Sequence, residues 1–131
     1  GRWTSTGSLA APRNKHTANR LPDGRVIVAG GESGANVVAT AEVFDPASGV
    51  WTAVAPMGTT RWGHSATLLP GGRLLVAGGT DDGFNSLATA EVYDPASDAW
   101  SPTGRMTWPD WECLMQRHDY LLVMAKKWRL H

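Results

Sequence analysis

The stretch AEVFDPASGVW at residues 41–51 returns almost unchanged as AEVYDPASDAW at residues 90–100. The two copies begin 49 residues apart, and an Arg-x-x-His motif and a Gly-Gly doublet also recur, at an offset of 48 residues. A fixed period near 50 residues indicates a protein built from repeated structural units, so this repeat decides the fold. The repeated residues are Arg13 and Arg61, His16 and His64, Gly30, Gly31, Gly78 and Gly79, Glu42 and Glu91, and Trp51 and Trp100.

Each copy is predicted to form four short β-strands. In the first copy they lie near residues 16–21, 25–31, 40–45 and 50–54. The turn sequences LPDGR and DPAS separate them, and the run RVIVAGG is typical of a strand buried on both faces. The second copy carries one more residue, in the loop TDDGFNSL against ESGANVV in the first. Four strands per repeat, with a Gly doublet and a late Trp, predict one blade of a β-propeller.

These motifs resemble the kelch repeat family, specifically its bacterial, galactose-oxidase-like variety. The resemblance rests on Arg-x-x-His, LPDGRVIVAGG, AEVFDP and Trp51 in the first copy, and on Arg-x-x-His, LPGGRLLVAGG, AEVYDP and Trp100 in the second. It covers residues 1 to about 107. It implies an all-β chain: a kelch-type β-propeller fragment with two complete four-stranded antiparallel blades plus partial flanking repeats.

The repeat divides the chain into four predicted segments. Residues 1–8 are predicted as the outer strand of a preceding blade, because Trp3 lies 48 residues before Trp51. Residues 9–56 and 57–105 form the two blades, and residues 106–131 depart from the repeat code. A divergent partial blade is favoured for this last segment, with an amphipathic helix as the alternative. Two blades do not close a ring of four to eight, so we expect a fragment, an assembly of several chains or an open arc.

Composition excludes several classes of function. Lys and Arg number 12, as do Asp and Glu, so the formal net charge of 0 predicts no nucleic-acid partner. The single cysteine, Cys113, excludes an internal disulfide and a multi-cysteine metal site. No apolar run approaches the length that would span a bilayer, so no membrane span is predicted.

A residue that occurs in every blade is interpreted as structural, because every blade needs it to fold. The repeated Arg, His, Gly, Glu and Trp residues all fall in this group, and we expect each Arg to pair with a Glu. The functional alternative is a ring of Arg and His at the mouth of a channel, which could hold an anion.

The loops that differ between the blades are the predicted binding region. Strand alternation places residues 9–13, 32–39, 57–61, 80–88 and 106–110 at one end of the blades. The family resemblance implies that loops of this kind often bind partners, with plain solvated loop as the alternative. The predicted partner-binding residues are Asn36, Trp62, Asp81, Asp82, Phe84, Asn85 and Trp108.

No catalytic residue, cofactor or metal is predicted. Galactose oxidase uses copper with tyrosine ligands, but Tyr93 and Tyr120 are the only tyrosines here and Tyr93 occupies a periodic core position, so no ligand is carried over. The favoured function is a non-catalytic module that presents blade loops to a protein or glycan. The alternatives are a piece of a larger secreted oxidase or carbohydrate-active enzyme and a structural blade pair without a ligand. Self-association through exposed blade faces and a secreted or cell-surface location are further expectations.

Overall fold

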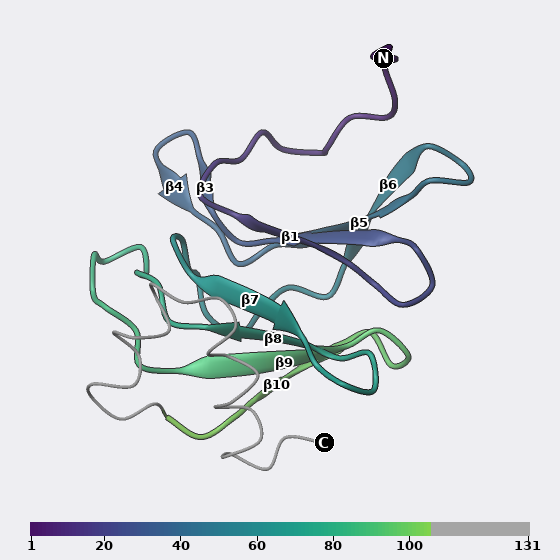
Figure 1. Cartoon of the computed structure of the whole chain (residues 1–131). Helices are drawn as coiled ribbons and strands as arrows, with labels where there is room; N and C mark the ends of the chain where they lie inside the picture. Colours follow the sequence, from purple (N-terminus) through teal and green to yellow (C-terminus); the bar gives the residue numbers. More distant parts are fainter. Residues whose placement is uncertain (106–131) are drawn as a thin grey trace.

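The computed structural model describes residues 1–105, which form strands, turns and loops with no helix in that range. Two four-stranded antiparallel sheets lie face to face, the first above the second in Figure 1. Because no helix occurs within residues 1–105, no helical membrane span is found there. The predicted all-β fold with two antiparallel blades is confirmed.

The first blade has the strand order β1-β2-β5-β6. Every neighbouring pair in it is antiparallel. These strands are β1 (Thr17–Arg20), β2 (Val26–Ala29), β5 (Ala41–Asp45) and β6 (Val50–Val54).

The second blade repeats this order as β7-β8-β9-β10. Its register is also the same: Trp100 lies opposite Tyr93 as Trp51 lies opposite Phe44. The repeat in sequence is therefore a repeat in strand pairing. The strands are β7 (Ser65–Leu68), β8 (Leu74–Ala77), β9 (Ala90–Asp94) and β10 (Ala99–Pro102).

A small hairpin that was not predicted joins β2 to β5. It consists of β3 (Glu32–Ser33) and β4 (Asn36–Val37), and Gly34 adopts a φ of 64° in its turn. Glycine adopts this left-handed conformation without a steric penalty, which allows the tight reversal. The loop of the second blade is one residue longer and has only an isolated bridge between Thr80 and Ser86.

The turns at the opposite end of the blades are nearly identical. The amide of Leu21 donates to the carbonyl of Arg25 at 2.7 Å, and that of Leu69 donates to Arg73 at 2.7 Å. The side chain of Asp45 accepts from the amide of Ala47 at 2.9 Å, as Asp94 accepts from Ala96 at 3.0 Å. Asp-Pro turns of this kind form because the carboxylate takes the place of a backbone acceptor. The turns at this end therefore have the same hydrogen bonds in both blades, because the two copies of the repeat have nearly the same turn sequences.

The main core lies between the two sheets. β2 and β5 contribute one apolar face, while β8 and β9 contribute the facing side chains, including Tyr93 at 2 % exposure. Trp100 packs against this cluster and is partly buried. The buried members are Leu21, Ile27, Ala29, Ala41, Val43, Met57, Ala66, Leu74, Val76 and Tyr93. Mutual burial of two apolar sheet faces is what a blade needs from its neighbour.

Residues 1–8 form no strand, and Trp3 is fully exposed. Their path still matches the linker between the blades: the indole of Trp51 donates to Gly7 O at 3.1 Å, as that of Trp100 donates to Ala55 O at 2.7 Å. The outer-strand assignment of this segment stays a prediction. Both alternatives for residues 106–131 lie outside the described residues.

Candidate functional site

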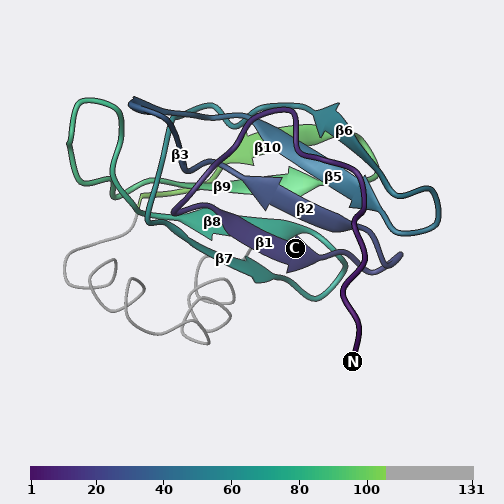
Figure 2. The ribbon, with the colours of Figure 1, turned by 90° about the horizontal axis from the view of Figure 1, so that it is seen from above.

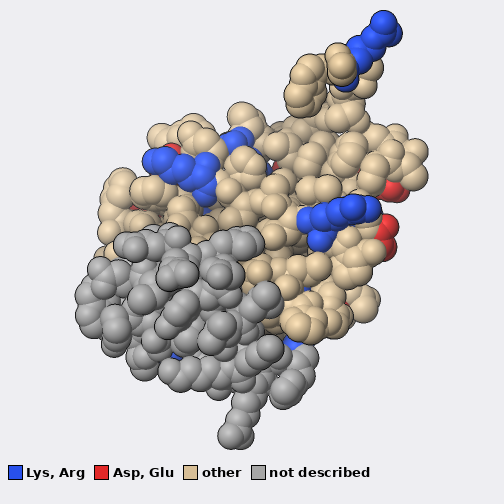
Figure 3. All heavy atoms as spheres, in the orientation of Figure 1, with Lys and Arg blue, Asp and Glu red and all other residues tan. Residues whose placement is uncertain are grey.

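Strand direction gathers the variable connections at one end, which we call the loop end and define as residues 9–16, 32–39, 57–64 and 80–88. Figures 1 and 2 show the β3–β4 hairpin and the connection between β8 and β9 at this same end. The predicted binding residues that the structure describes all belong to it: Asn36, Trp62, Asp81, Asp82, Phe84 and Asn85. Trp108 and the loop at 106–110 lie outside the described residues. In Figure 3, the Lys and Arg side chains on the visible face lie in small separate groups.

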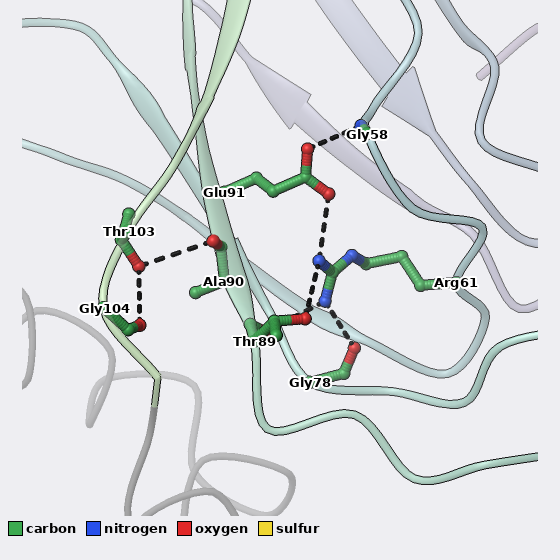
Figure 4. Close-up of polar contacts among 8 residues, drawn as sticks. All are labelled: Gly58, Arg61, Gly78, Thr89, Ala90, Glu91, Thr103 and Gly104. Atoms are coloured by element: carbon green, nitrogen blue, oxygen red, sulfur yellow. Dashed lines mark hydrogen bonds and ion pairs between the residues drawn. The ribbon is translucent and has the colours of Figure 1, made fainter.

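A buried Arg–Glu pair fixes the base of the loop end in the second blade (Figure 4). Arg61 Nη2 lies 2.9 Å from Glu91 Oε2, and Arg61 Nη1 donates to the carbonyls of Gly78 and Thr89, each at 3.0 Å. Glu91 Oε1 accepts from the amide of Gly58 at 2.6 Å. The pair therefore ties the linker that enters the blade to β9 and to the Gly doublet.

The first blade contains the same pair. Arg13 Nη2 lies 2.9 Å from Glu42 Oε2, and Glu42 Oε1 accepts from the amide of Ala10 at 2.8 Å. Arg13 Nη1 donates to the carbonyls of Gly30 and Thr40 at 2.9 and 3.0 Å. Both terminal nitrogens of each arginine are thus bound by protein acceptors. This arrangement supports a structural role. It argues against the alternative anion ring, because the terminal nitrogens already donate to protein acceptors.

The surroundings of both repeated histidines disfavour the charged imidazole. Nε2 of His64 lies 2.9 Å from Oγ1 of Thr17 and so links the two blades. Burial, and then the charge of Arg61, lower the pKa of His64 to about 4. Burial, and then Arg13, also lower the pKa of His16. Neutral imidazoles do not attract anions at neutral pH, which again favours structure over binding.

The Gly doublets let the blades converge. Gly30 has a φ of 67°, and a Cβ atom on it would lie 2.5 Å from the carbonyl oxygen of Arg61. The next amide, that of Gly31, donates to that same carbonyl at 2.9 Å. A larger residue at Gly30 would therefore push the second blade away from the first.

The connection between β8 and β9 has a regular neck and an irregular tip. At the neck, Trp62 and Thr80 exchange two backbone hydrogen bonds of 3.0 and 2.9 Å, and Leu87 N donates to Gly79 O at 2.9 Å. The first blade has the same neck: Val38 N donates to Gly31 O at 2.9 Å. The two blades therefore differ in the tip and not in its support.

Asp81 organises this tip. Its Oδ1 accepts from the amides of Gly83 and Asn85, each at 2.9 Å, and its own amide donates to Asn85 O at 3.0 Å. These bonds, that of the Asn85 amide first, hold the pKa of the Asp81 carboxyl below its usual range. Asp82 is exposed, and its amide lies 3.4 Å from Thr60 Oγ1. Phe84 stands at the tip with 80 % of its surface exposed and a φ of 62°.

Trp62 lies beside a charged pair from the other blade. Nζ of Lys15 lies 4.2 Å from the centre of its ring and 3.5 Å from Glu32 Oε2. The structure therefore joins Trp62 to the neck of the second loop and to the first blade. Asn36 is exposed on β4, in the corresponding hairpin of the first blade.

Sequence reasoning missed a second contact that joins the blades. Asp98 Oδ1 accepts from the hydroxyl of Tyr93 at 2.9 Å and from the amide of Ala55 at 3.0 Å. In the first blade Phe44 and Gly49 occupy these two positions. Their joint replacement by Tyr and Asp was a signal in the repeat. Burial, and then the bond to Asp98, raise the pKa of Tyr93 to about 12.

The surface of residues 1–105 carries a matching groove in each blade. Within residues 1–105, no group of His, Cys, Asp and Glu side chains is arranged to hold a metal ion. A groove of about 590 Å³ lies between the linker at residues 55–59 and strands β9 and β10, and a smaller one of about 220 Å³ lies at the matching place in the first blade. Cys113, Tyr120 and His118 are outside the described residues.

Comparison with known proteins agrees with the geometry. The model of the kelch motif matches residues 20–58 and 61–107, which together are more than half of the chain. Among curated proteins, no match was found. The first matched segment begins at the end of β1, and the second begins just before β7. Each runs through the outer strand of its blade, β6 or β10. The chain belongs to the kelch repeat family.

Proposed function

We propose that this chain is a protein-interaction module that binds its partner at the loop end. Kelch repeats generally mediate interactions between proteins, and the chain contains two of them. Loops carried on a rigid sheet scaffold are common sites of recognition.

One observation carries the proposal: the two blades are alike in the Arg–Glu pair, the neck and the turns, and differ at the loop tip. The first blade has a short hairpin around Gly34, and the second has the longer tip from Asp81 to Asn85. Repeated features serve folding, so a difference on exposed surface supports a role outside the fold. Glycan binding, membership of a larger secreted enzyme, self-association and a secreted location stay predictions.

A loop exchange tests the proposal. In the chimera, SGANV from residues 33–37 of the first blade replaces DDGFNS at residues 81–86, which keeps Thr80 and Leu87 of the neck and changes only the tip. The matched control is Ala96→Ser, an exposed position in a turn at the opposite end. Both variants and the original chain are immobilised, and proteins retained from an extract of the source organism are quantified by mass spectrometry. We expect the control to retain the same proteins and the chimera to lose them.

Equal retention by all three chains would contradict binding at the loop end. Circular dichroism melting of the chimera confirms beforehand that the blades are folded.

A further inference from the structure

We propose that Phe84 is the apolar anchor of the loop end, and that the partner is a protein with an apolar pocket bordered by Lys or Arg. This inference rests on the proposed function and names the chemistry of its partner. It follows from three independent observations at the tip of the second blade: the exposure of Phe84, the rigidity of its loop and the local excess of acidic side chains.

Phe84 is placed where it contributes little to the fold. It is 80 % exposed, at the far end of a connection whose neck is already closed by the Thr80 and Leu87 hydrogen bonds. Its φ of 62° lies in the left-handed region, which a bulky side chain rarely adopts. An exposed phenyl ring in a strained backbone conformation points to a role in binding.

The loop holds this conformation before any partner arrives. Asp81 accepts hydrogen bonds from the amides on both sides of Phe84, at Gly83 and Asn85, and the amide of Phe84 itself donates to Asp81 O at 3.2 Å. The Asn85 side chain adds contacts to both Asp81 oxygens at 3.3 Å. A preorganised tip loses little conformational entropy on binding, which is the property expected of an interface anchor.

The charge around Phe84 sets the kind of pocket. Asp81 and Asp82 precede it closely, whereas Lys15, the exposed cation of the loop end, is already paired with Glu32 at 3.5 Å. Arg61 is fully buried against Glu91 and offers no charge to solvent. Acidic side chains therefore remain in excess beside the ring. A partner pocket with a basic border satisfies this surface and speeds association.

The first blade shows what the tip looks like without these features. Its hairpin carries Gly34 and Ala35 in the turn, and its acidic residue, Glu32, is paired with Lys15. The anchor is thus a property of the second blade alone, added to a neck that both blades share.

Photo-crosslinking identifies the partner and the position that it contacts in one experiment. p-Benzoylphenylalanine is placed in separate chains at Phe84, at Ala35 in the first hairpin and at Ala96 in the opposite turn. Each chain is irradiated in an extract of the source organism, and crosslinked proteins are identified by mass spectrometry. The protein crosslinked at position 84 is then purified and titrated by calorimetry with the unlabelled chain and its variants.

We expect crosslinking at position 84 and none at position 96. We expect Phe84→Ser to raise the dissociation constant by about 10- to 50-fold, as the loss of one buried phenyl ring implies. Phe84→Tyr should retain most of the affinity. Asp82→Asn should make the affinity less sensitive to added salt. Unchanged melting of Phe84→Ser separates lost binding from lost structure.

Several outcomes would overturn this inference. Crosslinking at position 35 with affinity unaffected by Phe84→Ser would remove Phe84 as the anchor and leave the proposed function intact. Crosslinking at position 96 alone, or at none of the three positions, would overturn both. A salt response that is the same in Asp82→Asn and in the original chain would reject the basic border of the pocket.

Discussion

The aromatic pairs of the two blades have the same geometry in different surroundings. Phe44 and Trp51, and likewise Tyr93 and Trp100, have ring centres 5.0 Å apart and planes inclined at 43°. Tyr93 is buried in the core between the blades, whereas Phe44 is only half-buried. The pair therefore belongs to the blade itself and follows from strand register. The difference in burial between Tyr93 and Phe44 comes from contact with the neighbouring blade.

The polar contacts divide in the same way. The Arg–Glu pairs join the parts of one blade and are equally buried in both, so they do not depend on a neighbour. The His64–Thr17 and Tyr93–Asp98–Ala55 contacts cross from one blade to the other. Contacts within a blade and contacts between blades can therefore be broken separately, and the following predictions do so.

The largest effect is expected for the Arg–Glu pair. Arg61→Met leaves the buried carboxylate of Glu91 uncompensated, which should lower the free energy of unfolding by about 3–5 kcal/mol. Arg13→Met should cost a similar amount, because Glu42 is equally buried. Urea unfolding measures both losses, and Arg25→Met, in an exposed ion pair with Asp23, is a control that should change little.

A small loss for Arg61→Met, together with lost binding of phosphate or sulfate, would instead favour the anion ring. A loss of stability in Arg61→Met without one in Arg13→Met would show that the pair acts between the blades.

The contact at the Gly doublet comes next. Gly30→Ala places a Cβ atom 2.5 Å from the carbonyl of Arg61 at a positive φ, so we expect a loss of about 3 kcal/mol. Gly34→Ala shares the positive φ but has nothing within 4 Å of the added atom, so strain alone should cost about 1 kcal/mol. Thermal melting of the two variants compares them. Equal losses would mean that the close approach of the blades is not what requires glycine.

A pH dependence should follow from His64. Its pKa is about 4 in the folded chain against 6.5 for an unfolded histidine, because folding buries the imidazole and disfavours its charged form. This contribution, about 3 kcal/mol, is complete above pH 6.5 and is lost as the pH falls from 6.5 toward 4. Urea unfolding at several pH values measures it. His64→Gln should flatten this part of the profile, whereas His16→Gln, at the less buried position, should leave most of the slope.

The smallest effect concerns the aromatic pairs. Tyr93→Phe removes the hydrogen bond to Asp98 and should cost about 1 kcal/mol. The reverse exchange in the first blade, Phe44→Tyr, should gain nothing, because Gly49 stands where the acceptor would be. Melting temperatures of the two variants test this difference. A gain for Phe44→Tyr would show that another acceptor is in reach.

The sequence predicted the strands and their pairing well, for physical reasons. The turn sequences LPDGR and DPAS end each strand, and the unbroken run in RVIVAGG identifies the buried second strand. Residue offsets identified Arg13 and Arg61, and Glu42 and Glu91, as equivalent positions. The expected Arg–Glu pair forms in each blade, Arg13 with Glu42 and Arg61 with Glu91.

The remaining features depend on neighbours or on very short patterns. The β3–β4 hairpin has two residues in each strand, which is too few for a hydrophobic period to appear. The stacking of Lys15 on Trp62 joins residues of different blades, and no local pattern encodes such a contact. The candidate loop could be located from strand direction, but the exposure of Phe84 required the conformation of its tip.

The extra residue of the second blade has a consequence for protein engineering. The insertion is confined to a tip that begins after Thr80 and ends before Leu87, and the hydrogen bonds of the neck are the same with or without it. Length and composition between these two positions can therefore change while strand register stays fixed. A designer could graft foreign segments there, and evolution could exchange one specificity for another, without redesigning the blade.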